Sequence, residues 1–478
     1  MLPNSWLLPF GLDKLAKSLA AEKERKLPVL SLEEHEKYGD TYAQYAGGLF
    51  TILTRDPRNI AALLAKQFPN FGYGPIRHNC FAPLLGDGIF TLDGPAWEHS
   101  RKLLAPIFHK PNFPALQTVE GHVQDLFSAI QAQGTAKDQV WTQTDLRPLI
   151  YDFTLDTATD FFLGKSTHLL RSRYQPPLKA NTKPGAGSIF SSAFNAAVSW
   201  TATRERFKAF YWLVNPAEFR SSCLSARQSL EAMIRGGLTH DSKHSALSDI
   251  YSKLDSSLDK TRDELINLIF AGRDSNASLL CWVFYALARE PGVYARLRKE
   301  VVTELGDKQP TKKDINGLEY LDCVVQETLR LFPAVPINGR LCVGSDTTLP
   351  VGGGEDGEQP VYVPQGTLIC FSTYGTHRSR KLYGEDVGEF RPERWMEGKG
   401  AKERGLDYSY QPFSAGPRRC LGENYALTLT KYTVCRLVQR FAGVRPAEEE
   451  GEDWQSKIKY QIGLTMAPDA GVLVKLSA

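Results

Sequence analysis

The sequence predicts a mainly α-helical protein with a small β portion, folded as one intertwined unit around a long central helix. Three observations predict this class. Apolar residues recur at helical spacing over much of the 478-residue chain, residues 261–290 form one unusually long helical stretch, and β-prone runs are confined to two short regions. The chain has no internal repeat and no clear linker that would divide it.

Residues 1–10 are apolar, but two prolines interrupt them. They are shorter than the ~20 residues that cross a bilayer, and they lack the basic residues of a secretory signal. From Leu12 onward, apolar residues recur between lysines, which predicts either an ordinary surface helix or an amphipathic helix on a membrane surface. We therefore expect an N-terminal segment over residues 1–30, able to touch a membrane but without an anchor, and a main domain over residues 31–478.

Two short β-prone runs, residues 41–46 and 49–54, follow the N-terminal segment. They are joined by Gly47-Gly48, which predicts a hairpin. Helical periodicity then dominates over residues 117–170 and 189–234. Most of the N-terminal half is therefore expected to be helical.

The predicted central helix begins at Thr261, where a capping box with Glu264 would satisfy free backbone donors, and it ends before Pro291. It is apolar on most faces, so it should cross the interior of the protein. A second β-rich region extends from residue 340 to 371 and contains the glycine-rich segment 352–357. That segment lacks the order of a phosphate-binding loop, so it is interpreted as a turn.

Composition narrows the class of protein. Fifty-seven Lys and Arg against fifty-four Asp and Glu give a formal charge of +3, too small to predict nucleic-acid binding. The mean hydropathy of -0.30 argues against a chain embedded largely in a membrane. Eight cysteines lie without paired close spacings, which favours reduced thiols and a cytosol-facing compartment.

The most informative stretch surrounds Cys420, which follows glycines, a proline and two arginines and precedes a predicted helix over residues 425–441. A free thiol has a pKa of ~8.5, and a helix N-terminus with neighbouring cations stabilises the thiolate that binds a metal. A buried, inert cysteine in a glycine-rich turn is the alternative interpretation. The surrounding pattern favours a metal ligand.

Here the sequence resembles the cytochrome P-450 family, whose signature F-x-x-G-x-R-x-C-x-G is met by Phe413, Gly416, Arg418, Cys420 and Gly422. The resemblance implies the cytochrome P-450 fold with a single haem domain. It also implies haem b, iron protoporphyrin IX, with Cys420 as the sulfur ligand of the iron.

Two further elements resemble the family. Glu327 and Arg330 match its E-x-x-R on one helix face, and Arg394 in Pro-Glu-Arg-Trp supplies the third member of a structural triad. Trp97 and Arg101 match its W-x-x-x-R. The resemblance implies that these two residues, with Arg340 and Arg418, bind the haem propionates, whose burial without partners would cost several kcal/mol. A core role is the alternative for Trp97.

Within the central helix, residues 271–276 resemble the family's oxygen-activating segment, at which the helix loosens. Asp274 and Ser275 would be catalytic, because an acid beside an alcohol can relay protons to the reacting oxygen. Serine replaces the usual threonine and Asn276 follows it, which weakens the direction of that relay. A local pair between Asp274 and Arg273 is the alternative.

The likeness is greatest to fungal microsomal n-alkane and fatty-acid ω-hydroxylases, through residues 85–94, 210–214 and 349–354. It implies terminal hydroxylation of a long aliphatic chain, with Phe90, Ala271 and Val335 contacting the substrate. It also implies O2 as co-substrate, electrons from NADPH-cytochrome P-450 reductase, and residence on the cytosolic face of the endoplasmic reticulum membrane, or a soluble protein if the missing anchor is genuine. A monooxygenase acting on a fungal polyketide or terpenoid, and a non-catalytic haem-binding protein, are the alternatives.

Overall fold

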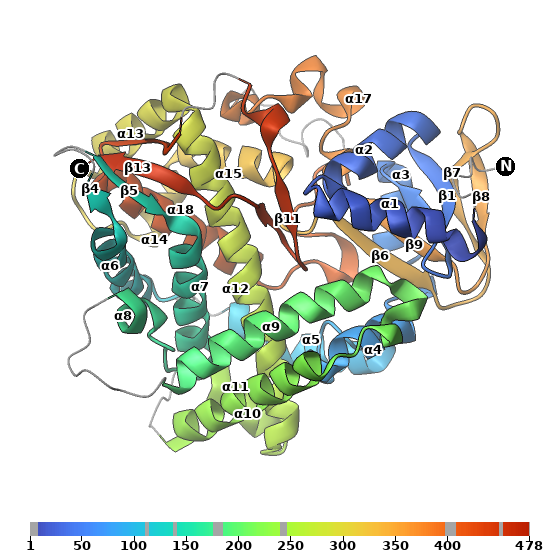
Figure 1. Ribbon diagram of the computed structural model, residues 1–478, viewed down its shortest axis with the longest axis horizontal. Helices are drawn as coiled ribbons and strands as arrows, with labels where there is room; N and C mark the ends of the chain where they lie inside the picture. Colours follow the sequence, from blue (N-terminus) through green and yellow to red (C-terminus); the bar gives the residue numbers. More distant parts are fainter. Residues whose placement is uncertain are drawn as a thin grey trace.

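The computed structural model describes residues 8–109, 114–136, 141–174, 185–239, 246–396, 408–448 and 453–477. Helices make up most of this part of the chain, which agrees with the predicted class (Figure 1). Their bounds are α1 (Leu12–Lys23), α2 (Leu27–Tyr38), α3 (Pro57–Ala61), α4 (Gly74–Leu85), α5 (Gly94–Phe108), α6 (Leu116–Gln133), α7 (Leu146–Leu163), α8 (Leu169–Tyr174), α9 (Ala186–Arg206), α10 (Ala217–Thr239), α11 (Ala246–Lys253), α12 (Leu258–Arg289), α13 (Pro291–Leu305), α14 (Lys312–Gly317), α15 (Glu319–Leu331), α16 (Thr373–Thr376), α17 (Arg380–Tyr383) and α18 (Glu423–Arg440).

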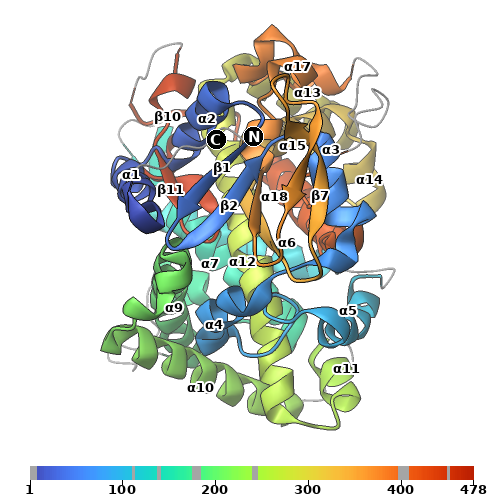
Figure 2. The same cartoon turned by 90° about the vertical axis from the view of Figure 1, so that its right-hand side faces the viewer.

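The strands form small sheets at two sides of the helical body (Figures 1 and 2). The larger sheet has the order β1-β2-β9-β6-β3, a second has the order β10-β13-β5-β4, and β7-β8 and β11-β12 pair separately. The bounds are β1 (Thr41–Ala46), β2 (Leu49–Thr54), β3 (Phe71–Gly72), β4 (Thr135–Ala136), β5 (Trp141–Asp145), β6 (Ile337–Cys342), β7 (Thr347–Gly353), β8 (Gln359–Val363), β9 (Leu368–Ser372), β10 (Gly443–Pro446), β11 (Tyr460–Ile462), β12 (Met466–Pro468) and β13 (Leu473–Ser477).

The predicted hairpin and turn are both present. Ala46 pairs with Leu49 across the turn between β1 and β2. Gly352 and Gly353 are the last residues of β7, and the rest of segment 352–357 forms the turn that leads to β8.

Several strands lie outside the two predicted β regions, namely β3, β4, β5 and β10 to β13. Residues 117–170 were expected to be helical, but β4 and β5 separate α6 from α7. β5 pairs with β13, near the other end of the sequence, so its partner could not be seen in local periodicity. Asp145 then starts α7 by accepting a hydrogen bond from the Arg147 backbone.

Helix α12 is the central element and packs against α7, α10, α15 and α18 (Figure 1). Its 32 residues span about 48 Å at 1.5 Å per residue. The predicted start at Thr261 is one turn too late. Ser257 caps the helix instead, accepting from the Lys260 backbone, and the Thr261 hydroxyl has no hydrogen-bond partner among the described residues.

Two apolar cores lie along α12. One surrounds its C-terminal half, where Trp282 stacks on Phe332 with ring centroids 4.2 Å apart. The other surrounds its N-terminal half and includes α9 and α10. A ligand site beside the middle of α12 would therefore lie between two rigid walls.

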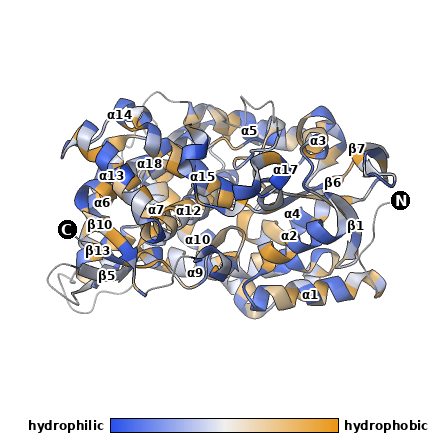
Figure 3. Ribbon diagram, turned by 90° about the horizontal axis from the view of Figure 1, so that it is seen from above, coloured by the Kyte–Doolittle hydropathy of each residue, from blue (hydrophilic) through white to orange (hydrophobic). Residues whose placement is uncertain are grey.

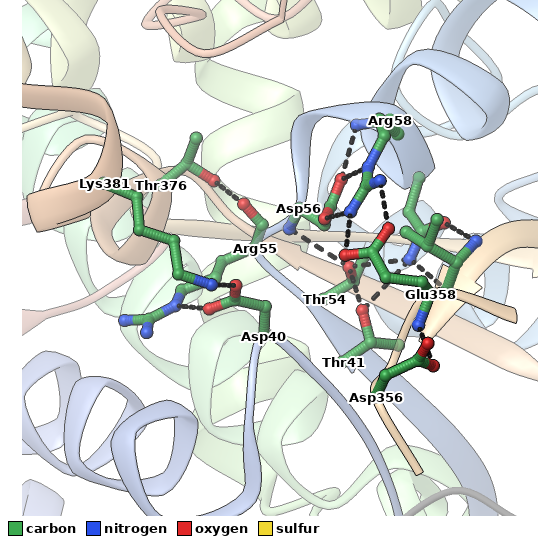
Figure 4. Close-up of polar contacts among 12 residues, drawn as sticks. Asp40, Thr41, Thr54, Arg55, Asp56, Arg58, Asp356, Glu358, Thr376 and Lys381 are labelled. Carbon is green, nitrogen blue, oxygen red and sulfur yellow. Dashed lines mark hydrogen bonds and ion pairs between the residues drawn. The ribbon is translucent and has the colours of Figure 1, made fainter. Parts of the chain in front are cut away.

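The large sheet is fixed to its surroundings by polar contacts (Figure 4). Arg58 on α3 contacts both Asp56 and Glu358, and Asp40 contacts Arg55 and Lys381. Each solvent-exposed ion pair contributes only about 0 to 1 kcal/mol to the free energy of unfolding. The network therefore matters more for holding these segments in position than for the stability of the fold.

Helix α1 carries mixed hydropathy along its length (Figure 3). Lys14 is buried in an ion pair with Glu34 on α2, while Leu12 and Leu19 are exposed. Within the described ranges, no helix combines the length and the apolar character needed to cross a bilayer.

Candidate functional site

Cys420 lies on a short loop between a 3-10 turn, η7 (Gly416–Arg418), and α18. Its backbone N–H donates to the Phe413 carbonyl at 3.0 Å. Gly416 has φ +65°, and a Cβ there would lie 1.9 Å from the carbonyl oxygen of Leu64, in the π-helical turn η2 (Ala62–Lys66). Only glycine fits that contact. The loop is therefore held against a distant part of the chain.

All eight cysteines fall within the described ranges and are unpaired, and Cys420 alone is exposed. Part of the Cys420 side chain is open to solvent. The protein packed around the sulfur nevertheless desolvates it and raises the pKa of the thiol to about 11. The Gly422 backbone, Arg101 and Arg419 act in the opposite direction but do not prevail. These groups act in the direction that the sequence predicts, but burial is the larger effect in the protein without a metal. A coordinated metal ion would lower the pKa of the thiol further, because its charge favours the thiolate.

A cluster of guanidinium groups surrounds the half-buried ring of Tyr73. The Cζ atoms of Arg77, Arg418 and Arg340 lie 4.0, 4.3 and 4.6 Å from its centroid. Desolvation raises the pKa of Tyr73, but these three cations lower it more, to about 8. Asp93 is the carboxylate of the cluster and lies 2.6 Å from Arg418 Nη2.

The cluster has unused donors. The buried Nε atoms of Arg77, Arg340 and Arg418, and Nη1 of Arg418, have no hydrogen-bond partner among the described residues. Burial lowers the pKa of Arg340 to about 10. Three cations facing one carboxylate require about two further negative charges, since each unmatched buried charge costs several kcal/mol. The two propionates of haem meet that requirement, so these residues fit the cofactor.

The predicted W-x-x-x-R residues contact each other, with Arg101 Cζ 5.8 Å from the Trp97 ring centroid, but their other contacts differ. Trp97 is buried on α5, and Arg418 Cζ lies 4.3 Å from its ring centroid. Arg101 donates instead to the Arg419 carbonyl at 2.9 Å, on the loop of Cys420. The structure thus brings Trp97, Arg340 and Arg418 together through the guanidinium cluster and places Arg101 beside the sulfur loop.

One face of α12 is accessible. From Thr261 to Ala288 every residue is buried except Asp263, Ala271 and Ser275. Ala271 and Ser275 are one turn apart, and Ser275 Oγ donates to the Ala271 carbonyl at 2.5 Å. The helix stays continuous over residues 271–276, so the expected loosening is not seen. The Ser275 hydroxyl, which the sequence predicts to be catalytic, therefore lies on the face of α12 that a ligand could reach.

Asp274 does not contact Ser275 through an observed hydrogen bond. Its Oδ1 accepts from Arg273 Nη1 at 2.9 Å, and both side chains are buried. The Arg273 Cζ lies 5.1 Å from the ring centroid of Tyr151 and 5.6 Å from that of Phe194. Burial raises the pKa of Asp274, and Arg273 lowers it to a smaller extent. The arrangement matches the alternative of a local Asp274–Arg273 pair.

Phe90 lies on the loop between α4 and α5, and its ring contacts Phe270 edge to face at 5.9 Å. Its backbone N–H donates to Asn267 Oδ1 at 3.2 Å. The Asp87 backbone donates to Asp263, and Ser100 Oγ donates to Glu264 at 2.9 Å. Sequence reasoning missed this polar side of α12, although three polar residues within one turn of an apolar helix were a visible signal.

Val335, the third predicted substrate contact, is 38% exposed in the turn after α15. Val335 is thus open to solvent, and Phe90 lies on a different loop, between α4 and α5. Their common role therefore remains a prediction.

The E-x-x-R residues form a fully buried ion network. Arg330 contacts Glu327 through Nε and Nη2 at 2.8 Å each, and Arg394 Nε lies 3.1 Å from Glu327 Oε1. Trp395 adds a fourth contact to the same carboxylate. Burial raises the pKa of Glu327, but these cations prevail and lower it. The network joins α15 to the segment before Cys420.

Comparisons with known proteins agree with this geometry. A family model described as Cytochrome P450 matches residues 18–469. Cytochrome P450 52A3-A of Candida maltosa is 37% identical, covering 97% of this chain and 89% of the relative. Cytochrome P450 monooxygenase alt2 of Alternaria solani is 36% identical over 99% and 91%, and Cytochrome P450 52A13 of Debaryomyces hansenii is 38% identical over 90% and 82%.

Proposed function

Since the chain belongs to the cytochrome P450 family and is therefore a haem-dependent monooxygenase, we propose that it hydroxylates a long-chain fatty acid or alkane at or near the chain end. The reaction uses O2, a small hydrophobic substrate and a redox partner. One observation carries the proposal. Cys420, the exposed cysteine, lies on a loop fixed by Gly416, close to the donor network of Arg418.

We assign the cofactor contacts residue by residue. Cys420 supplies the sulfur ligand, with Phe413, Gly416 and Gly422 shaping its loop. The free donors of Arg340 and Arg418 would bind the propionates, and Trp97 holds Arg418 in place. When bound, haem supplies the activation of O2 that inserts one oxygen atom into a C–H bond.

Ser275 is the proposed proton carrier on the accessible face of α12. Its hydroxyl hydrogen rests on the Ala271 carbonyl, and rotation about χ1 would redirect it toward the reacting oxygen. Serine lacks the methyl group that restricts χ1 in threonine. Asp274 Oδ1 accepts from Arg273 Nη1, and no hydrogen bond joins Asp274 to Ser275 among the described residues. Passing a proton from Asp274 to Ser275 would therefore require at least one of these side chains to move.

Apolar residues beside this face support an aliphatic substrate. Phe90, Phe270 and Ala271 offer carbon surface rather than charge, and we propose Val335 as a further apolar contact. Each buried methylene contributes ~0.8 kcal/mol, so a chain of a dozen methylenes would bind without an ionic anchor.

Membrane residence is proposed on the cytosolic face of the endoplasmic reticulum, with NADPH-cytochrome P-450 reductase as electron donor. Phe10 contacts Phe210, which joins the N-terminal segment to the 3-10 helix η4 (Lys208–Leu213). Exposed apolar side chains lie on both segments, namely Leu8, Phe10, Leu12, Trp212 and Leu213. Such a patch supports surface contact with a bilayer.

The test is reconstitution of purified holoprotein with the reductase and NADPH. We expect hydroxylated products from C12 to C18 fatty acids or from alkanes of similar length. If none of these fatty acids and alkanes is hydroxylated, the substrate assignment is wrong. Cys420→Ala is expected to abolish the thiolate form of the carbon monoxide difference spectrum, which tests the sulfur ligand separately.

A fungal polyketide or terpenoid is a second candidate substrate. It is favoured by Asn276, which donates to the Gly272 carbonyl at 2.6 Å where the family pattern has Thr or Ser. Spectral titration of the holoprotein with both compound classes separates the candidates, because only a compound that enters the haem pocket shifts the Soret band.

A further inference from the structure

A surface pocket of about 480 Å³ lies where α4, α9, η4 and α10 meet. Figure 2 shows α4 beside α10 and α9. The volume of the pocket lies in the range typical of small-molecule binding sites. None of its lining residues belongs to the site of Cys420; they are Pro83, Arg204, Trp212, Asn215, Phe219, Arg220, Cys223, Leu224 and Arg227.

Three arginines line the pocket, and two of them give it a net positive charge. Arg227 is neutralised by Asp263, 2.9 Å away. Arg204 is 5% exposed and donates to the carbonyls of Val214 and Asn79, and its buried Nε has no partner among the described residues. Arg220 is exposed and donates to the Asn215 carbonyl at 2.6 Å. Neither Arg204 nor Arg220 forms an ion pair with any residue that the structure describes.

The unused donor of Arg204 is held rigidly. Its Cζ lies 4.7 Å from the ring centroid of Phe219 and 5.1 Å from that of Tyr211. A buried donor without a partner costs about 1 to 3 kcal/mol. An anion that reached this guanidinium would recover the missing hydrogen bond.

Exposed apolar side chains also line the pocket. Trp212 is 60% exposed and Leu224 is 57% exposed, and both line the pocket with Phe219. Large exposed apolar side chains beside unpaired cations match a ligand with one anionic end and one hydrocarbon end.

We propose that this pocket binds a long-chain fatty acid, with its carboxylate on Arg204 and Arg220 and its chain against Trp212 and Leu224. The site is separate from the haem pocket, and its occupation does not require that fatty acids be the substrate.

Fluorescence of holoprotein titrated with laurate tests the site. The signal lost in Trp212→Phe isolates the response of Trp212 from the other tryptophans. We expect a saturable Trp212 response to laurate but none to dodecanol, which has the same chain without the charge. The Soret band, read in the same titration, reports the haem pocket independently.

Arg220→Gln is the decisive variant, because Arg220 is exposed and its loss should leave the fold intact. We expect laurate to bind at least about tenfold more weakly, equal to about 1.4 kcal/mol. Arg235→Gln is the matched control on α10, since Arg235 pairs with Glu231 and does not line the pocket. It should bind as wild type does.

Two further readouts keep the proposal falsifiable. Wild-type binding should weaken from low to high salt, because exposed charges are screened. Equal responses to laurate and dodecanol, or unchanged binding in Arg220→Gln, would overturn the proposal. So would a Trp212 response confined to vesicles of acidic phospholipid, which would assign the pocket to a membrane lipid.

Discussion

Arg340 and Arg418 are cations buried with donors to spare. A protein can hold such buried cations when a ligand brings negative charge. Three guanidinium groups and one carboxylate leave a charge of +2, which a ligand with two negative charges would balance. Ser275 presents the opposite case. Its single hydroxyl hydrogen is already donated to a carbonyl, so its function depends on how easily it turns.

Arg340→Leu should weaken haem retention, because it removes a cation that we propose to bind a haem propionate. We expect haem to transfer to apomyoglobin about tenfold faster, equal to about 1.4 kcal/mol. The decay of the Soret band measures the transfer. Arg380→Leu, on an exposed arginine of α17, is the control, and equal rates in the two variants would refute the assignment.

Ser275→Ala should uncouple NADPH consumption from product. Loss of the proton carrier is expected to lower product per NADPH on the order of tenfold, with hydrogen peroxide as the alternative product. Ser275→Thr should raise coupling above wild type, because the added methyl restricts χ1. Unchanged coupling in both variants would remove Ser275 from the relay.

Helix α12 is the element that organises the site. Its N-terminal turns hold the loop of Phe90 through Asp263, Glu264 and Asn267, and its middle turns present Ala271 and Ser275. Glu264 is buried with Ser100 as its side-chain partner on α5. Burial raises its pKa to about 7, with Asp263 adding to the rise and hydrogen bonds from Ser100 and the Ile89 backbone opposing it.

A raised carboxyl pKa makes the ionised form unfavourable in the folded protein. The free energy of unfolding should therefore fall as pH rises from about 4.5 to about 7, and the loss should persist above that range. Glu264→Gln is expected to remove this loss, giving a gain of about 2 to 3 kcal/mol at pH 8 relative to pH 4.

Urea unfolding of the holoprotein at pH 4 and pH 8 measures the effect. Glu98→Gln is the control, because Glu98 is an exposed carboxylate on α5. An equal pH dependence in wild type and Glu264→Gln would show that Glu264 ionises normally.

The whole molecule joins segments that are far apart in sequence, and that limits what sequence alone could predict. The hairpin of β1 and β2, the long helix and the signature around Cys420 are local patterns, and all three were predicted. Two other features were not predicted. The ion pair of Arg418 is made with Asp93, which is far away in the sequence, and α12 begins after Ser257, which lies outside the apolar run. Tyr73 and Arg77 were missed because their role appears only when they meet Arg340.

The proposed contact with a membrane involves the N-terminal segment and η4, which meet where Phe10 contacts Phe210. Leu213→Ser combined with Phe10→Ser should reduce co-flotation with phospholipid vesicles about tenfold or more, since burial of each large apolar side chain contributes about 1.5 to 3 kcal/mol. Tyr362→Ser, which removes an exposed aromatic on β8, is the control. Undiminished flotation would place the membrane contact elsewhere.

The contact of Gly416 with the Leu64 carbonyl has a consequence for biogenesis. Leu64 emerges from the ribosome about 350 residues before Gly416, and at 5 to 20 residues per second the interval is about 20 to 70 s. Over that interval the nascent chain has one half of the cradle for the cysteine loop and lacks the other. Haem binding through Cys420 is therefore expected late in the synthesis of each chain. A chain that ends before residue 416 lacks this cysteine and would not bind haem through it.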